Sequence, residues 1–188
     1  STLVNTVKVP WYGLINRTVQ DSSLESHIVD VTTTAASTAG STDPWAVVDG
    51  NYGTFFHSAR DSQYAGPTVT FDREYTMDTL AFTTRLGGGY GSYYRVQVRV
   101  ENEAGEVTTY ETPSDNVKVS NIAGAENSFL VEFPKSQVKK ITVQFARYYR
   151  DPVTFSELAF YAYDSLWDDA MALWEDDMHT VLRSDVDA

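Results

Sequence analysis

Apolar and polar residues alternate with a period of two in segment after segment of this chain, and this pattern restricts the fold more than any other. In one segment, Val96, Val98 and Val100 alternate with Arg and Gln. Such alternation is typical of a β-strand with one face in a core and the other outside. The same pattern, or a short apolar run, recurs at residues 28–36, 68–72, 80–82, 117–119, 130–133, 141–145 and 158–162. Because these segments are short, end at Gly, Pro or Asn turns and have no helices between them, they predict an all-β fold, an antiparallel β-sandwich.

The composition is that of a globular domain and argues against several partners. Of 188 residues, 42% are hydrophobic and 13% aromatic, which is enough to build one core, with or without an appendage. The net charge of −12 argues against nucleic acid and anionic membranes, since both attract basic surfaces. No apolar run is long enough for membrane insertion. The absence of Cys removes disulfides, thiolate metal sites and Cys nucleophiles.

The two ends of the chain differ from its middle. Residues 1–27 show no sustained period, and we expect a leader or an edge strand there. From residue 164 the apolar spacing becomes helical, and Trp167 and Trp174 join an apolar stripe in a segment that is otherwise strongly acidic. The pattern predicts an amphipathic C-terminal α-helical extension over residues 164–188. It either folds back on the sandwich or links it to a following module.

The stretch 45–58 combines a turn signal with closely spaced oxygen atoms. Asp49-Gly50-Asn51 is typical of a turn, because Gly accepts a positive φ and Asp and Asn bond their own backbone. Asp49, Asn51 and Thr54 place side-chain oxygens at close spacing, a mixture that hard cations such as calcium prefer. The alternative is a surface turn without a metal, and the motif lacks the regular acidic series of an EF-hand loop.

Residues 49–58 resemble the "DG-x-x-x-T-x-W-H-S" signature of coagulation factor V/VIII type C (discoidin) domains and of the bacterial family 32 carbohydrate-binding modules. Phe56 stands where these families usually have Trp. The resemblance continues through residues 67–71, 79–85, 94–106 and 155–163, and so covers about residues 28–163. It implies a jelly-roll β-sandwich of the galactose-binding-domain-like type over this range.

The resemblance also implies two sites. In the family, a Glu at the position of Glu157, in Phe155-Ser156-Glu157-Leu158, closes a calcium site, and we therefore expect a structural calcium ion. Without the resemblance, the alternative is that Glu157 points to solvent, as a lone Glu in a strand usually does. The His of the signature and the Arg at the end of a later strand reach sugar hydroxyls in galactose-binding members, and an aromatic ring supplies a flat partner for the sugar face. The expected metal ligands are Asp49, Asn51, Thr54 and Glu157, and the expected carbohydrate-binding residues are His57, Arg85, Tyr90, Tyr93 and Tyr149.

Two positions depart from the galactose-binding pattern. The run 86–94 contains no Asn, whereas galactose binders usually carry one a few residues after the Arg. Arg60 stands where some members offer a stacking Trp. These differences bear on the sugar that is bound, not on the fold.

No catalytic signature is present: the Gly-rich run 87–91 precedes a strand instead of a helix, and the three His are far apart. We therefore expect a non-catalytic, calcium-stabilised carbohydrate-binding module of a larger secreted or cell-surface bacterial glycosidase or peptidase. Its partners would be a glycan with terminal galactose or N-acetylgalactosamine and the neighbouring modules, and it would be a monomer. The alternatives are a protein- or lipid-binding discoidin-type domain, or a spacer that only packs against a catalytic neighbour.

Overall fold

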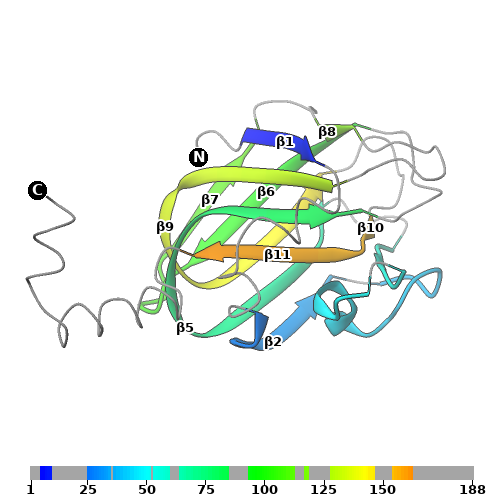
Figure 1. Cartoon of the computed structure of the whole chain (residues 1–188), viewed down its shortest axis with the longest axis horizontal. Helices are drawn as coiled ribbons and strands as arrows, with labels where there is room; N and C mark the ends of the chain where they lie inside the picture. The colour runs from blue at the N-terminus through cyan, green and yellow to red at the C-terminus, as the bar shows by residue number, and fades with distance from the viewer. Residues whose placement is uncertain are drawn as a thin grey trace, which may run out of the picture.

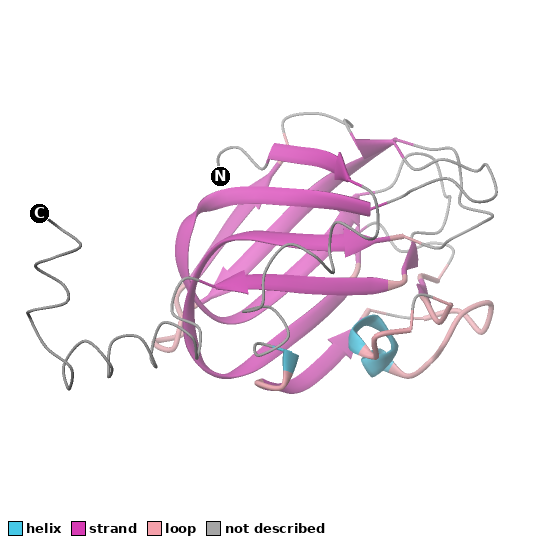
Figure 2. Cartoon of the chain, in the orientation of Figure 1, coloured by secondary structure: helices cyan, strands magenta, loops and turns pink. Residues whose placement is uncertain are grey.

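The computed structural model describes residues 5–9, 25–34, 36–51, 53–59, 64–84, 93–112, 117–118, 128–146 and 154–162. Strands make up most of this part of the chain, and helix is confined to short turns (Figure 2). A 3₁₀ helix, η1, spans Pro44–Val48. The strands are β1 Asn5–Val9, β2 Ile28–Thr33, β3 Phe56–His57, β4 Tyr64–Ala65, β5 Pro67–Thr83, β6 Tyr93–Glu101, β7 Val107–Glu111, β8 Val117–Lys118, β9 Ser128–Ala146, β10 Thr154–Phe155 and β11 Glu157–Ala162.

The strands form the two layers of an antiparallel sandwich, which confirms the predicted architecture. One layer has the order β11–β5–β9–β1, and its strands lie side by side nearest the viewer in Figure 1. The other has the order β2–β5–β9–β6–β7, with β6 and β7 at the back. The short strand β4 extends the pairing of β9, β8 pairs with β6, and β3 pairs with β10 in a separate ribbon at one end.

Strands β5 and β9 belong to both layers, and here the expectation of short, separate strands was wrong. Residues 68–72 and 80–82 lie on one 17-residue strand, and residues 130–133 and 141–145 lie on one 19-residue strand. Both strands bend where their mutual register shifts, between Thr70 and Tyr75 and between Met77 and Thr79. Bulges of this kind bend a strand and increase its twist, so one strand can leave the first layer and enter the second without a loop.

Aromatic side chains fill the space between the layers. Phe82 lies within ring-centroid distances of 5.1 Å of Phe129, 4.9 Å of Phe145 and 5.6 Å of Phe155, and Phe71 of the second layer meets Phe160 of the first at 5.2 Å. Each buried ring contributes on the order of 1.5–3 kcal/mol. The alternation predicted for β6 is confirmed, because Val96, Val98 and Val100 are buried while Arg99 is exposed.

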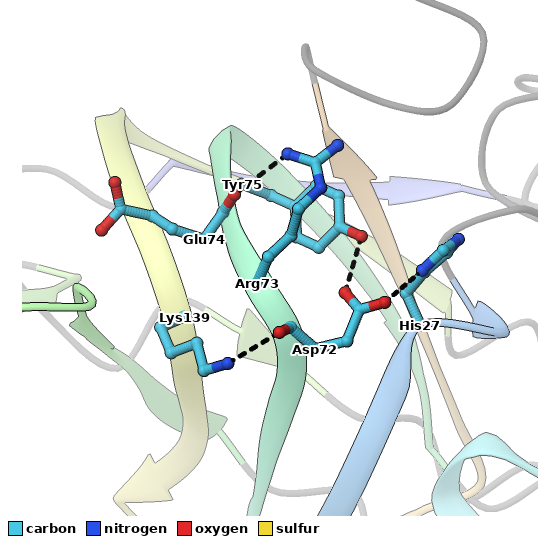
Figure 3. Close-up of polar contacts among 6 residues, drawn as sticks. All are labelled: His27, Asp72, Arg73, Glu74, Tyr75 and Lys139. Carbon is cyan, nitrogen blue, oxygen red and sulfur yellow. Dashed lines mark hydrogen bonds and ion pairs between the residues drawn. The ribbon is translucent and has the colours of Figure 1, made fainter. Parts of the chain in front are cut away.

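A polar cluster holds the bend of β5 against the start of β2 (Figure 3). The Asp72 carboxylate is bonded to His27 Nδ1 and accepts a hydrogen bond of 2.8 Å from the Tyr75 hydroxyl. The Asp72 backbone N–H donates to the His27 carbonyl over 2.8 Å, and Lys139 Nζ donates to the Asp72 carbonyl over 2.9 Å. The Arg73 guanidinium lies 4.2 Å from the centre of the Tyr75 ring. These contacts join β2, β5 and β9 at the bend.

The two ends of the chain contribute differently to what is described. β1 forms the edge of the first layer, where it pairs with β9. The predicted C-terminal helix, residues 164–188, lies outside the described residues. Among the described residues, no helix is long and apolar enough to cross a membrane.

Candidate functional site

The turn at residues 49–54 follows directly after helix η1, which begins at Pro44 under an Asp43 cap. Gly50 has a φ of +74°, the left-handed conformation that Gly adopts without a steric penalty. Asp49 Oδ1 accepts the Asn51 N–H over 2.9 Å, and Asn51 Oδ1 accepts the Gly53 N–H over 2.9 Å. These self-bonded Asp and Asn side chains form the turn that the sequence predicts.

Oxygen atoms gather on one side of this turn. The Thr54 hydroxyl lies 2.6 Å from Asp49 Oδ2 and 2.9 Å from the Asn51 carbonyl oxygen, and donates to one of them. Asn51 Oδ1 is already engaged by the Gly53 N–H, so Asn51 offers its main-chain oxygen to this side of the turn rather than its side chain. A carboxylate, a hydroxyl and a carbonyl thus come together within six residues of sequence.

Glu157, the first residue of β11, reaches the turn from 107 positions away. Its Oε1 accepts the Gly50 N–H over 3.2 Å, while Oε2 is buried and has no hydrogen-bond partner. The residue is only 4% exposed, which rules out the solvent-facing alternative. Burial raises the pKa of Glu157 to about 8; the Gly50 N–H opposes this shift, and the charges of Asp49 and Glu25 add to it.

The structure therefore brings together the predicted ligands Asp49, Thr54 and Glu157, with Asn51 beside them through its backbone. An unpartnered carboxylate oxygen next to a second carboxylate is costly unless a proton or a cation neutralises it. The site is poor in carboxylates, since no group of three or more His, Asp or Glu side chains in the described residues is arranged to hold a metal ion. Neutral oxygens would have to supply the remaining ligands, as calcium allows.

His57 lies in the ribbon at the end of the sandwich, where β3 pairs with β10. It is 6% exposed and sits opposite Thr154, and its Nδ1 lies 3.0 Å from the Ser58 carbonyl oxygen. A Cβ at Gly40 would lie only 2.9 Å from the His57 Cβ, so a glycine is needed beside it. With Nδ1 donating to a carbonyl, the neutral ring carries its proton on that nitrogen.

The other predicted carbohydrate-binding side chains lie outside the part of the chain that the structure describes. Arg85, Tyr90 and Tyr149 lie outside the described residues, and Tyr93 is described only in its backbone, which starts β6. Thr84, the residue before Arg85, is described, and its carbonyl oxygen accepts a hydrogen bond of 3.0 Å from the Ser156 hydroxyl. Ser156 directly follows β10, whose residues pair with Phe56 and His57.

Buried polar residues are concentrated at this end of the sandwich, and apart from His57 the sequence patterns did not single them out. His57, Ser58, Thr83, Thr84, Thr154 and Ser156 are all at most 6% exposed. Sequence reasoning also missed the His27–Asp72–Tyr75 cluster and the contribution of Glu25 to the charge around Glu157. No local signal could have found them, because each joins segments far apart in the chain.

The comparisons with known proteins identify the fold. No protein-family model and no curated protein matches the chain. Among solved structures, the modules CBM32-1 and CBM32-2 of Clostridium perfringens ZmpB in complex with GalNAc match with a TM-score of 0.63 at 14% identity, over 86% of this chain and 40% of that one. The family 32 module of C. perfringens NanJ in complex with galactose matches with a TM-score of 0.57 at 17% identity, over 73% of this chain and 96% of that one.

A third match places such modules in a larger protein. The structure of CBM32-1, CBM32-2 and the M60 catalytic domain of C. perfringens ZmpB matches with a TM-score of 0.59 at 14% identity, over 87% of this chain and 17% of that one. The chain thus spans about the length of one isolated module and less than half of the multimodular structures. At these identities the likeness concerns the backbone: the chain has the fold of the family 32 carbohydrate-binding modules.

Proposed function

We propose that this chain is a non-catalytic carbohydrate-binding module of family 32, which binds a glycan with terminal galactose or N-acetylgalactosamine at the end of the sandwich around His57. The observation that carries this proposal is the combination of fold and position: solved structures with this fold hold galactose and GalNAc, and the His of the signature sits in the β3–β10 ribbon at one end of this sandwich. The chemistry of His57 supports it, since an imidazole nitrogen can hydrogen-bond a sugar hydroxyl.

Arg85 is the second member of the proposed sugar site. Thr84, the residue before it in sequence, accepts a hydrogen bond from Ser156, which directly follows β10. A guanidinium donates up to five hydrogen bonds, whereas the neutral His57 ring, whose Nδ1 donates to the Ser58 carbonyl, can only accept at Nε2. Together they match a sugar hydroxyl pair, and Tyr90, Tyr93 or Tyr149 would cover the apolar face of the ring.

The test is a glycan-array screen of the whole chain in the presence of calcium, with His57→Ala and Arg85→Ala. We expect binding to terminal galactose or N-acetylgalactosamine that both substitutions abolish. Arg95→Ala is the matched control, because Arg95 pairs with Glu111 on the second layer and should leave binding intact. A blank array with a protein that melts cooperatively would refute the proposal.

We further propose that Asp49, Thr54, Glu157 and the Asn51 carbonyl hold a structural calcium ion. The unpartnered Glu157 Oε2 supports this, because a buried carboxylate oxygen requires a proton or a cation. An ion there would link the turn after η1 to the start of β11 and so stabilise the end of the sandwich that carries His57. It would have no part in any reaction.

The setting of the module follows from the same likeness. In ZmpB, modules of this fold occur together with an M60 catalytic domain, and we propose that this chain likewise belongs to a larger secreted or cell-surface bacterial glycosidase or peptidase. Its function would be to hold the catalytic neighbour near glycan-bearing substrate.

A further inference from the structure

The outer face of the second layer carries a polar depression that no part of the proposed galactose site uses. It has a volume of about 220 Å³ and lies where β6 ends and β7 begins, with side chains from β2, β5, β9, β6 and β7 in its lining. Register explains its composition: Thr32 pairs with Thr68, Thr68 with Thr142, and Thr142 with Arg99. In the next row outward-facing Lys140 pairs with Glu101, which in turn pairs with Val107.

Two cations in this depression form no ion pair with any described residue, although the Glu101 carboxylate lines it as well. Neither Arg99 nor Lys140 makes an ion pair or a side-chain hydrogen bond in the described structure. Glu101 stands opposite Lys140 across the strand pair without forming an ion pair with it. Asp30, the next acid in that row, is separated from Lys140 by Thr70, which places it two strands or roughly 10 Å away. With two cations and one carboxylate in its lining, the depression carries a local positive charge in a chain whose net charge is −12.

Hydroxyl groups line the same depression. The Thr68 and Thr142 hydroxyls bond each other over 2.7 Å, so one of the two hydrogens and several lone pairs remain available. Thr32 adds a third hydroxyl from the edge strand. Val107, 48% exposed, supplies the apolar contact at the other edge.

We infer that this depression binds an acidic sugar residue, one that bears a carboxylate or a sulfate. The anion would sit between Arg99 and Lys140, whose charged N–H groups form strong hydrogen bonds with carboxylate and sulfate oxygens. The sugar hydroxyls would donate to Glu101 and exchange hydrogen bonds with the threonines. A neutral sugar leaves the two cations unused, and an inorganic anion offers no hydroxyl to Glu101, so the lining favours a ligand that carries both groups.

The binding should be weak and dependent on salt. The depression is smaller than the roughly 300–1,000 Å³ of pockets that bury drug-sized ligands, and none of the side chains that line it is aromatic. A dissociation constant on the order of 1 mM is expected for a single small sugar held by so few contacts. Exposed charge pairs are screened within about 10 Å at 0.1 M salt, so affinity should fall as salt is raised.

The test is a titration of the ¹⁵N-labelled whole chain, followed by the amide signals in NMR spectra. The probes are sodium glucuronate and galactose 6-sulfate, and the controls are glucose, galactose and sodium sulfate. We expect the two acidic sugars, but not glucose, to shift the signals of Thr68, Arg99, Lys140 and Thr142. The double substitution Arg99→Gln/Lys140→Gln should weaken binding about tenfold or more, the loss typical for hydrogen bonds to a charged group.

Two variants separate this site from the rest of the molecule. Arg95→Gln removes a cation from the same strand and face but outside the depression, and should leave the affinity for acidic sugars unchanged. His57→Ala should likewise leave it unchanged, whatever it does to galactose. Shifts confined to residues near His57, equal shifts with sodium sulfate, or no shifts with the acidic sugars would each overturn the assignment.

Discussion

Glu157 offers the sharpest test of how this sandwich is held together, because it is a buried carboxyl group with one unpartnered oxygen. In the calcium-free protein its pKa is raised from 4.5 to about 8. A raised carboxyl pKa means that the folded protein binds the proton more tightly than the unfolded chain. Its contribution to stability is therefore complete below pH 4.5 and is lost as the pH rises towards 8.

The magnitude follows from the same shift. Each unit of pKa difference corresponds to about 1.4 kcal/mol, so ionising Glu157 in the folded protein costs up to about 5 kcal/mol between pH 4.5 and 8. Glu157 is 4% exposed, so solvent screening reduces this little. Gln at position 157 keeps an oxygen for the Gly50 N–H but cannot ionise, and its stability should not show this loss. Calcium should reverse the loss in the wild type, by about 2.7 kcal/mol at a concentration one hundred times its dissociation constant.

The assay is chemical denaturation of wild type and Glu157→Gln at pH 5 and pH 9, in EDTA and in calcium. Because the free energy of unfolding is compared between the two pH values within each protein, any constant cost of burying the Gln side chain in the variant cancels. We expect the free energy of unfolding to fall with pH by several kcal/mol more in the wild type than in the variant, and calcium to stabilise only the wild type. Equal pH dependence in EDTA would refute the burial argument, and equal responses to calcium would refute the metal site.

Three further predictions test the fold, two of them with a control substitution. In Gly66→Ala the new Cβ would lie 1.8 Å from the Val143 carbonyl oxygen, and the substitution should cost several kcal/mol of stability or prevent folding. The control Gly105→Ala, with open space around the Cβ and a φ of +84°, should cost about 1–2 kcal/mol. Similar losses of unfolding free energy for the two variants in denaturation would contradict the close contact at Gly66. Phe82→Ala should lower the free energy of unfolding by about 3–5 kcal/mol. Val29 is 55% exposed, so Val29→Ala should lower it by less than about 0.5 kcal/mol. A small loss for Phe82→Ala would show that the core repacks. Burial raises the pKa of Asp72, but hydrogen bonds from His27 and Tyr75 and the charge of His27 outweigh this effect, and the net pKa is lowered. The stability that the Asp72 carboxylate contributes is therefore present above its unfolded pKa and is lost in acid. Asp72→Asn should therefore cost about 1 kcal/mol at pH 7 and less at pH 3, and an unchanged acid limb of the melting curve would contradict this.

The local sequence alone determined the faces of the strands and the turn after η1. The alternation at Val96, Val98 and Val100 predicts which side chains are buried, because side-chain direction in a strand repeats every two residues. The turn at Asp49–Asn51 is equally local: Gly50 adopts its positive φ, and Asp49 and Asn51 bond the backbone two residues on. Such preferences act over a few residues and can be read without knowing the rest of the fold.

Only the tertiary structure decided how distant segments meet. The continuity of β5 and β9 through both layers depends on a mutual register and its bulges, and no alternation pattern records where a strand bends. The burial of Glu157 depends on the turn that it meets, since Leu158 beside it is buried as well and both faces of β11 are covered at that point. The depression around Arg99 and Lys140 likewise exists because pairing aligns five strands, and pairing is a long-range choice that balances burial against chain entropy over the whole molecule.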